Sequence, residues 1–88
     1  MLHEIYKILV MKDLLHKVEQ PEALQKFIKK LQLCKNDETI LINKYCLDVK
    51  DKTQIYNLKI SPRQFYKLHN KVLIRAYDAM RLRIRYKF

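Results

Sequence analysis

Hydrophobic residues recur every three or four positions along most of this chain. That period is typical of α-helices with one buried face. Polar or proline-containing breaks divide the pattern into five segments before the last eight residues. The predicted helices cover residues 2–19, 23–33, 39–47, 53–58 and a longer segment that begins at Ser61.

The first predicted helix is apolar on more than one side. Its main apolar side carries Ile5, Ile8, Leu9, Met11 or Lys12, Leu15 and Val18, and other sides carry Tyr6, Val10 and Leu14. Such a broad apolar surface is typical either of a deeply buried helix or of one half of an interface. Both interpretations stay open, and the second gives the hypothesis that the N-terminal helices form a homodimer.

The start of the fifth helix carries the clearest local signal. Ser61 is followed by Pro62 and, three positions after the serine, by Gln64. Serine and glutamine at this spacing form a capping box, in which each side chain bonds the other's backbone N–H. Proline suits the first helical position because its fixed φ is already helical. The predicted buried face beyond this start consists of Phe65, Leu68, Val72, Ala76 and Ala79 or Met80.

The last eight residues, 81–88, alternate cationic and apolar side chains. A period of two is the signature of a β-strand. The first interpretation is therefore a short terminal strand, which has to pair with another strand, such as its copy in a dimer. A helical extension with a charged end is the alternative.

The composition supports a mainly helical fold. The chain of 88 residues has no glycine and two prolines, whereas an all-β sandwich or barrel needs many turns with positive φ. Its length suffices for one domain with a modest core. We therefore predict a single small all-α domain, with N-terminal helices over residues 1–35, a helix-turn-helix over 36–80 and a tail over 81–88.

The charge of the chain indicates a polyanionic partner. There are 19 Lys and Arg against 9 Asp and Glu, a net charge of +10. Residues 61–88 hold eight cations and a single acid, Asp78, for a net charge of +7, whereas the first sixty residues have a net charge of +3. Nucleic acid is the commonest partner of such a surface. A lysine-rich domain without such a partner is the plainer alternative.

A short helix, a tight turn and a capped basic helix form the layout of a DNA-binding helix-turn-helix. The first turns of the second helix then meet base edges of double-stranded DNA, and nearby cations meet phosphates. Candidate base contacts are Arg63 to guanine, Gln64 and Asn70 to adenine, and Tyr66 and Lys67 to bases or phosphates. Candidate phosphate contacts are Lys50, Lys52, Thr53, Lys59, Lys71 and Arg75. The capping box competes for the Gln64 side chain.

We expect no enzyme activity, cofactor or metal site. The acids fall at caps, connectors and polar helix faces, and no nucleophile stands beside a histidine in a catalytic pattern. Cys34 and Cys46 lack the spacing of a zinc site, so we expect reduced cysteines in or near the core of a cytoplasmic protein. No apolar run reaches membrane-spanning length, and charges through residues 1–18 argue against a signal peptide.

Residues 36–80 resemble the promoter-reading C-terminal domain of bacterial sigma factors. The likeness rests on Lys44-Tyr45, on Ile60-Ser61 and on the spacing between them, while Ile55 or Tyr56 replaces a small residue and Lys59 replaces the turn glycine. A closer resemblance is to phage transcriptional regulators of the ArpU/RinA kind. It is carried by residues 60–66, by Lys71-Val-Leu73, and by Ala76, Ala79-Met80 and Leu82-Arg-Ile84.

This resemblance implies sequence-specific DNA binding that controls late or packaging genes of a phage or prophage. The predicted function is therefore that of a homodimeric transcriptional regulator. Two alternatives stay open. One is a module that binds RNA polymerase or a sigma factor through the N-terminal helix, and the other is a DNA-packaging protein similar to a small terminase subunit.

Overall fold

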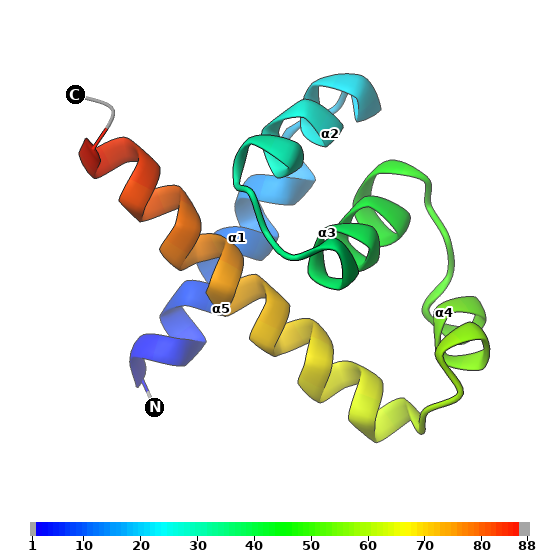
Figure 1. The fold of residues 1–88 in the computed structure, drawn as a ribbon. Helices are drawn as coiled ribbons and strands as arrows, with labels where there is room; N and C mark the ends of the chain where they lie inside the picture. The colour runs from blue at the N-terminus through cyan, green and yellow to red at the C-terminus, as the bar shows by residue number, and fades with distance from the viewer. Residues whose placement is uncertain (1, 87–88) are drawn as a thin grey trace.

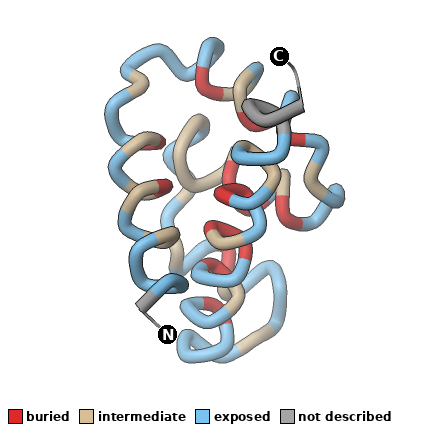
Figure 2. Tube along the Cα trace, turned by 90° about the vertical axis from the view of Figure 1, so that its left-hand side faces the viewer, coloured by how far each residue is buried: buried red, intermediate tan, exposed pale blue. Residues whose placement is uncertain are grey.

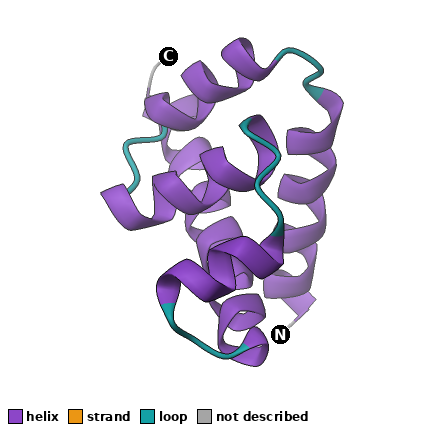
Figure 3. Cartoon of the chain, turned by 90° about the vertical axis from the view of Figure 1, so that its right-hand side faces the viewer, coloured by secondary structure: helices purple, strands orange, loops and turns teal. Residues whose placement is uncertain are grey.

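The computed structural model describes the backbone of residues 2–86 and the side chains of residues 3–82. Its elements are α1 (Leu2–Lys17), α2 (Pro21–Lys30), α3 (Lys35–Leu41), the π-helical segment η1 (Ile42–Cys46), α4 (Asp51–Leu58) and α5 (Pro62–Tyr86). Figure 3 shows helices and loops over this part of the chain, with no strand in it. The predicted all-α fold is confirmed.

Local sequence explains where α2 and α3 begin. Pro21 stands in the first turn of α2, where a missing N–H costs nothing. The third helix begins at Lys35, with extended backbone at Cys34, four residues before its predicted start at Thr39. Asp37 lies in the first turn of this helix, and its carboxylate accepts hydrogen bonds from Arg75 of α5.

The long helix α5 organises the fold. Its 25 residues span about 37 Å, close to the longest dimension of the molecule, 41 Å. Figure 1 shows α1 crossing α5, with α2, α3 and α4 all on one side of α5 and with α4 next to the loop that leads into it. The buried core cluster consists of Met11, Leu15, Leu24, Ile28, Leu31, Ile40, Leu41, Val72, Leu73, Ala76 and Tyr77.

The predicted buried face of α5 is largely confirmed. Phe65, Val72 and Ala76 have no exposed surface, and Leu68, Ala79 and Met80 are partly buried. The buried face is wider than predicted, because His69, Leu73 and Tyr77 are buried as well. Figure 2 shows short buried stretches alternating with exposed ones along the helices.

The two sides of α1 have different surroundings. Met11 and Leu15 are buried against the rest of the domain, whereas Ile5, Tyr6 and Leu9 remain 54–60% exposed. A helix buried all round is therefore excluded for this domain. The other interpretation, in which α1 forms half of an interface, stays a prediction.

The terminal strand is wrong over residues 81–86, which continue α5 as a helix, as the alternative had it. The helix forms despite the period-two pattern, because a helix satisfies its own backbone N–H and C=O groups, whereas a lone strand has no partner for them. Residues 87–88 of the predicted tail lie outside the described residues. Cys34 is exposed, so its predicted place in or near the core is wrong, while Cys46 is half-buried.

Candidate nucleic-acid interface

The turn between α4 and α5 is built on a left-handed residue. Lys59 has φ 57° and ψ 42°, a conformation that glycine adopts without steric cost and lysine does not. The backbone N–H of Ile60 donates to the carbonyl of Ile55 at 3.4 Å, and that of Lys59 donates to the carbonyl of Tyr56 at 3.2 Å. These two bonds form a Schellman motif, which ends α4 and turns the chain into α5.

The predicted capping box at the start of α5 is confirmed. The backbone N–H of Ser61 donates to Gln64 Oε1 at 2.9 Å, and the backbone N–H of Gln64 donates to Ser61 Oγ at 3.1 Å. This pair of bonds fixes the first turn of α5, the turn that carries Arg63. It also occupies the Gln64 carbonyl oxygen, so a pairing of Gln64 with adenine has to compete with the cap.

The candidate side chains on α5 are all exposed: Arg63, Gln64, Tyr66, Lys67, Asn70, Lys71 and Arg75. Arg63, Lys67 and Lys71 are four residues apart, so they form one column along the outward face of the helix. Asn70 lies beside this column, and Tyr66 lies at its edge with 52% of its surface exposed. The backbone therefore presents three cations, an amide and a phenol to solvent.

Arg63, Lys67 and Lys71 have no ion pair with any described residue. The acids that come nearest in sequence bond other elements: Asp51 pairs with Lys44, and Asp78 pairs with Lys7 of α1 at 2.7 Å. The positive charge of the column is thus not compensated by carboxylates of the domain. An uncompensated row of cations attracts polyanions and repels other cations.

Arg75 differs from the other candidates. Its Nη1 donates to both carboxylate oxygens of Asp37, at 3.0 and 2.9 Å. The hydrogen bonds and the negative charge raise the pKa of Arg75. Because the Asp37 side chain is only 5% exposed, its charge needs this partner. Arg75 therefore holds α5 against α3, and a phosphate contact would compete with that bond.

The outward side of α4 carries the remaining candidates. Lys52, Thr53 and Lys59 are exposed, as is Lys50 just before the helix. Tyr56, which the sequence reasoning did not include, is 82% exposed and stands four residues after Lys52 on the same face. The helical spacing from Lys52 was the signal that could have identified Tyr56.

A stack of aromatic rings holds the first half of α5 in place. The imidazole of His69 lies between two rings, 6.3 Å from the Phe65 centroid and 5.9 Å from that of Tyr45. His16 of α1 meets the other side of Tyr45 edge to face at 5.4 Å. The stack joins α5, η1 and α1, and so fixes the direction in which the outward face of α5 points.

The buried polar pair in this stack is neutral. Burial, together with the positive charges of Lys44 and Lys12, lowers the pKa of His69 to about 4, and Asp51 opposes this only in part. Burial and the negative charge of Asp51 raise the pKa of Tyr45 to about 12. The Tyr45 hydroxyl therefore keeps its proton at neutral pH, and it shares a hydrogen bond of 3.0 Å with Nε2 of His69.

Two other features, a metal site and a membrane-spanning helix, are not found among the described residues. No group of three or more His, Cys, Asp and Glu side chains within residues 3–82 is placed to hold a metal ion. Over the same part of the chain, no helix combines the length and the apolar character that a membrane span requires.

No family profile, curated protein or solved structure matches this chain. The resemblance to sigma-factor domains and to ArpU/RinA-like regulators therefore stays a prediction. It rests on the residues quoted for it.

Proposed function

We propose that the protein binds double-stranded DNA with the outward face of the first half of α5 and regulates transcription. The observation that carries this proposal is the column of Arg63, Lys67 and Lys71, which is exposed and has no carboxylate partner among the described residues. The column covers eight residue steps, or about 12 Å, and the major groove is about 12 Å wide.

In this mechanism α5 enters the major groove by its first turns. Arg63 donates two hydrogen bonds to one guanine edge, and Asn70 and Tyr66 reach neighbouring bases. Lys67, Lys71 and the cations around the turn, Lys52 and Lys59, neutralise phosphates and release counterions. Gln64 and Arg75 contribute less, because the cap and Asp37 already bind their side chains.

The salt dependence of binding to a fluorescent duplex tests the interface. The triple variant R63A/K67A/K71A removes two proposed phosphate contacts and one base contact, so the slope of log affinity against log salt should fall by about 1.8, and affinity near 0.15 M salt should fall on the order of 10²-fold or more. The matched control is K26A/K29A/K30A, which removes three exposed lysines of α2 and gives the same net charge. Equal losses in both triple variants would mean that total charge alone governs binding.

Selection from random duplexes tests the regulatory part of the proposal. A site-specific regulator should prefer the selected sequence over random DNA by more than ~10³-fold. Substituting Arg63 alone should then relax the choice of base at one position, because that side chain is proposed to read it. Equal affinity for selected and random duplexes would instead favour a structural or packaging role.

We infer that the functional unit is a homodimer formed through α1. Ile5, Tyr6 and Leu9 of α1 and Leu82 of α5 are each more than half exposed. The start of α1 and the end of α5 lie on the side of the domain away from α4 (Figure 1). A two-fold dimer would place two copies of α5 on successive half-sites of the DNA. The same apolar surface is what a contact with RNA polymerase or a sigma factor would use, which is the second candidate function.

Sedimentation of matched leucine variants separates these two uses. Leu9→Glu places a charge in the proposed interface and should convert the dimer to a 10.8 kDa monomer at micromolar protein. Leu47→Glu is the control, because Leu47 is as exposed as Leu9, 61% against 60%, but lies after η1. A wild-type chain that sediments as a monomer would exclude the homodimer and leave the polymerase contact as the use of this surface.

A further inference from the structure

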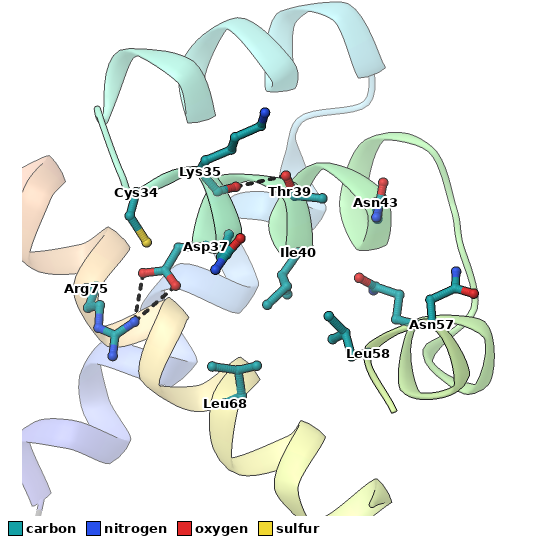
Figure 4. Close-up of a pocket in the computed structure, with 12 residues that line it drawn as sticks. Cys34, Lys35, Asp37, Thr39, Ile40, Asn43, Asn57, Leu58, Leu68 and Arg75 are labelled. Carbon is teal, nitrogen blue, oxygen red and sulfur yellow. Dashed lines mark hydrogen bonds and ion pairs between the residues drawn. The ribbon is translucent and has the colours of Figure 1, made fainter. Parts of the chain in front are cut away.

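The helix α4 buries little of its own surface. Gln54 is the one buried residue among the eight of α4, and the helix packs mainly against α5. A cavity of about 540 Å³ adjoins it, between α3, α4 and α5 (Figure 4). Ile40, Leu58 and Leu68 line this cavity, one residue from each helix. Because the cavity separates these side chains, α4 lacks the apolar contacts that would anchor it to α3.

The side chain that α4 buries weakens its docking. Gln54 is only 4% exposed, and its Nε2 has no hydrogen-bond partner among the described residues. A buried donor without an acceptor loses the hydration that it has in water, and this loss is destabilising. Movement of α4 away from the other helices would return Nε2 to water. The docked position is therefore less stable than an apolar residue at position 54 would make it.

Both ends of α4 adjoin a left-handed residue. Asp48, three residues before the helix, has φ 54°, and Lys59, directly after it, has φ 57°. This conformation carries a steric cost for residues other than glycine, and the cost is larger for lysine than for aspartate. Residues at the ends of an element are the ones that absorb dihedral changes when the element moves. These two positions are therefore suited to act as hinges, and a turn about them would relieve their strain.

Within the described residues, one ion pair ties α4 to another element. Lys44 Nζ of η1 donates to both carboxylate oxygens of Asp51 at 3.0 Å. The two side chains are 25% and 27% exposed. Such a partly exposed pair is screened by salt and is a weak tether.

We propose that α4 is a hinged helix, which opens as a unit while the other helices stay packed. The opening does not depend on the proposed binding of DNA. One consequence does rest on that function. Because Lys52 belongs to α4 and Lys59 to its hinge, the opening would change their distance from Arg63, and so the spacing of the proposed DNA contacts.

Native-state hydrogen exchange of the full chain in low urea, followed by NMR, tests the opening. The backbone N–H groups of residues 54–60 should share one exchange protection, at least ~10-fold lower than that of residues 72–77 in the core. Their exchange should also depend less on urea, because the opening exposes little surface. Protection that rises gradually from one end of α4 would indicate fraying, and protection equal to that of residues 72–77 would indicate global unfolding alone. Either result would overturn the proposal, and neither measurement needs a variant.

Gln54→Leu is the variant that tests the cause. It removes the buried donor, so exchange of residues 54–60 should slow by about 10-fold, as expected for relief of one unsatisfied group. Lys52→Leu is the matched control, because it brings the same residue to the exposed face of α4 from a residue of similar helix propensity. It should leave the exchange unchanged. Equal slowing in both variants, or none in Gln54→Leu, would contradict the part that the proposal gives to Gln54.

Discussion

The two halves of α5 have different surroundings. We divide α5 at Val72 into a shorter first half, residues 62–71, and a longer second half, residues 72–86. The second half crosses α1 and buries Val72, Leu73, Ala76 and Tyr77. The first half buries only Phe65 and His69, and most of its other residues are exposed. The exposed residues differ as well, because Arg63, Lys67 and Lys71 are exposed on the first half and Leu82 is 54% exposed on the second.

The two halves of α5 therefore have different roles. Apolar packing against α1 anchors the second half, so the first half needs only a narrow buried face and keeps the rest of its circumference for a partner. The aromatic stack of Phe65, His69 and Tyr45 supplies that narrow face. A stiff helix then transmits the orientation set at the crossing to the exposed cations.

Two leucine-to-alanine variants test whether stability is concentrated at the crossing. Leu73 has no exposed surface and Leu58 of α4 is 44% exposed. Leu73→Ala should lower the free energy of unfolding by about 3 kcal/mol, because it leaves a cavity in the core, whereas Leu58→Ala should cost less than about 1 kcal/mol. Urea denaturation followed by circular dichroism measures both. Similar losses in the two variants would contradict an anchor at the α1 crossing.

The pH dependence of stability tests the packing of the first half of α5. The pKa of His69 is about 4 in the folded chain, against the ordinary histidine value of 6.5 that the unfolded chain has, so the unfolded state binds this proton first as the pH falls. Its contribution is complete above pH 6.5 and should fall by about 2 kcal/mol between pH 7 and pH 5. Urea denaturation at each pH measures this loss.

His69→Phe is the variant that isolates this proton, because phenylalanine keeps a ring between Phe65 and Tyr45 without a titrating group. The dependence between pH 7 and pH 5 should flatten in His69→Phe. It should persist in His3→Gln, since His3 is exposed on α1. An unchanged pH profile in His69→Phe would mean that other groups cause the loss.

The features of α5 and of the turn before it that depend on residues close together in the chain could be predicted from the sequence. The capping box at Ser61, the turn at Lys59 and the helical spacing of Phe65, Val72 and Ala76 depend on residues close in the chain. Such signals survive because neighbouring side chains and backbone decide them. The exposure of Arg63, Lys67 and Lys71 followed from the same periodicity.

The features that could not be predicted from the sequence depend on contacts between residues far apart in the chain. In the sequence, Arg75 is one more cation of α5. In the fold, it pairs with the buried carboxylate of Asp37 of α3, which is 38 positions away in the chain. His69 is enclosed by Phe65 and by Tyr45, which comes from η1, 24 positions away in the chain. The alternation after Arg81 was assigned to a strand because periodicity alone ignores whether a partner strand exists. Each of these outcomes is decided by tertiary packing.

The smallest expected change in the free energy of unfolding concerns Lys59, in the turn that leads into the less buried first half of α5. Lys59 holds a left-handed conformation that costs lysine about 1 kcal/mol relative to glycine. Lys59→Gly should therefore raise the free energy of unfolding by up to about 1 kcal/mol, less the entropy that glycine adds to the unfolded chain. The control is Lys52→Gly inside α4, which removes the same charge and should lower stability by about 0.5–1 kcal/mol. Urea denaturation of the two variants should thus give shifts of opposite sign.

A loss of stability in both variants would contradict this prediction. It would mean that the side chain of Lys59, rather than its backbone conformation, matters at the turn. The α4–α5 corner would then be held more firmly than its few buried residues indicate.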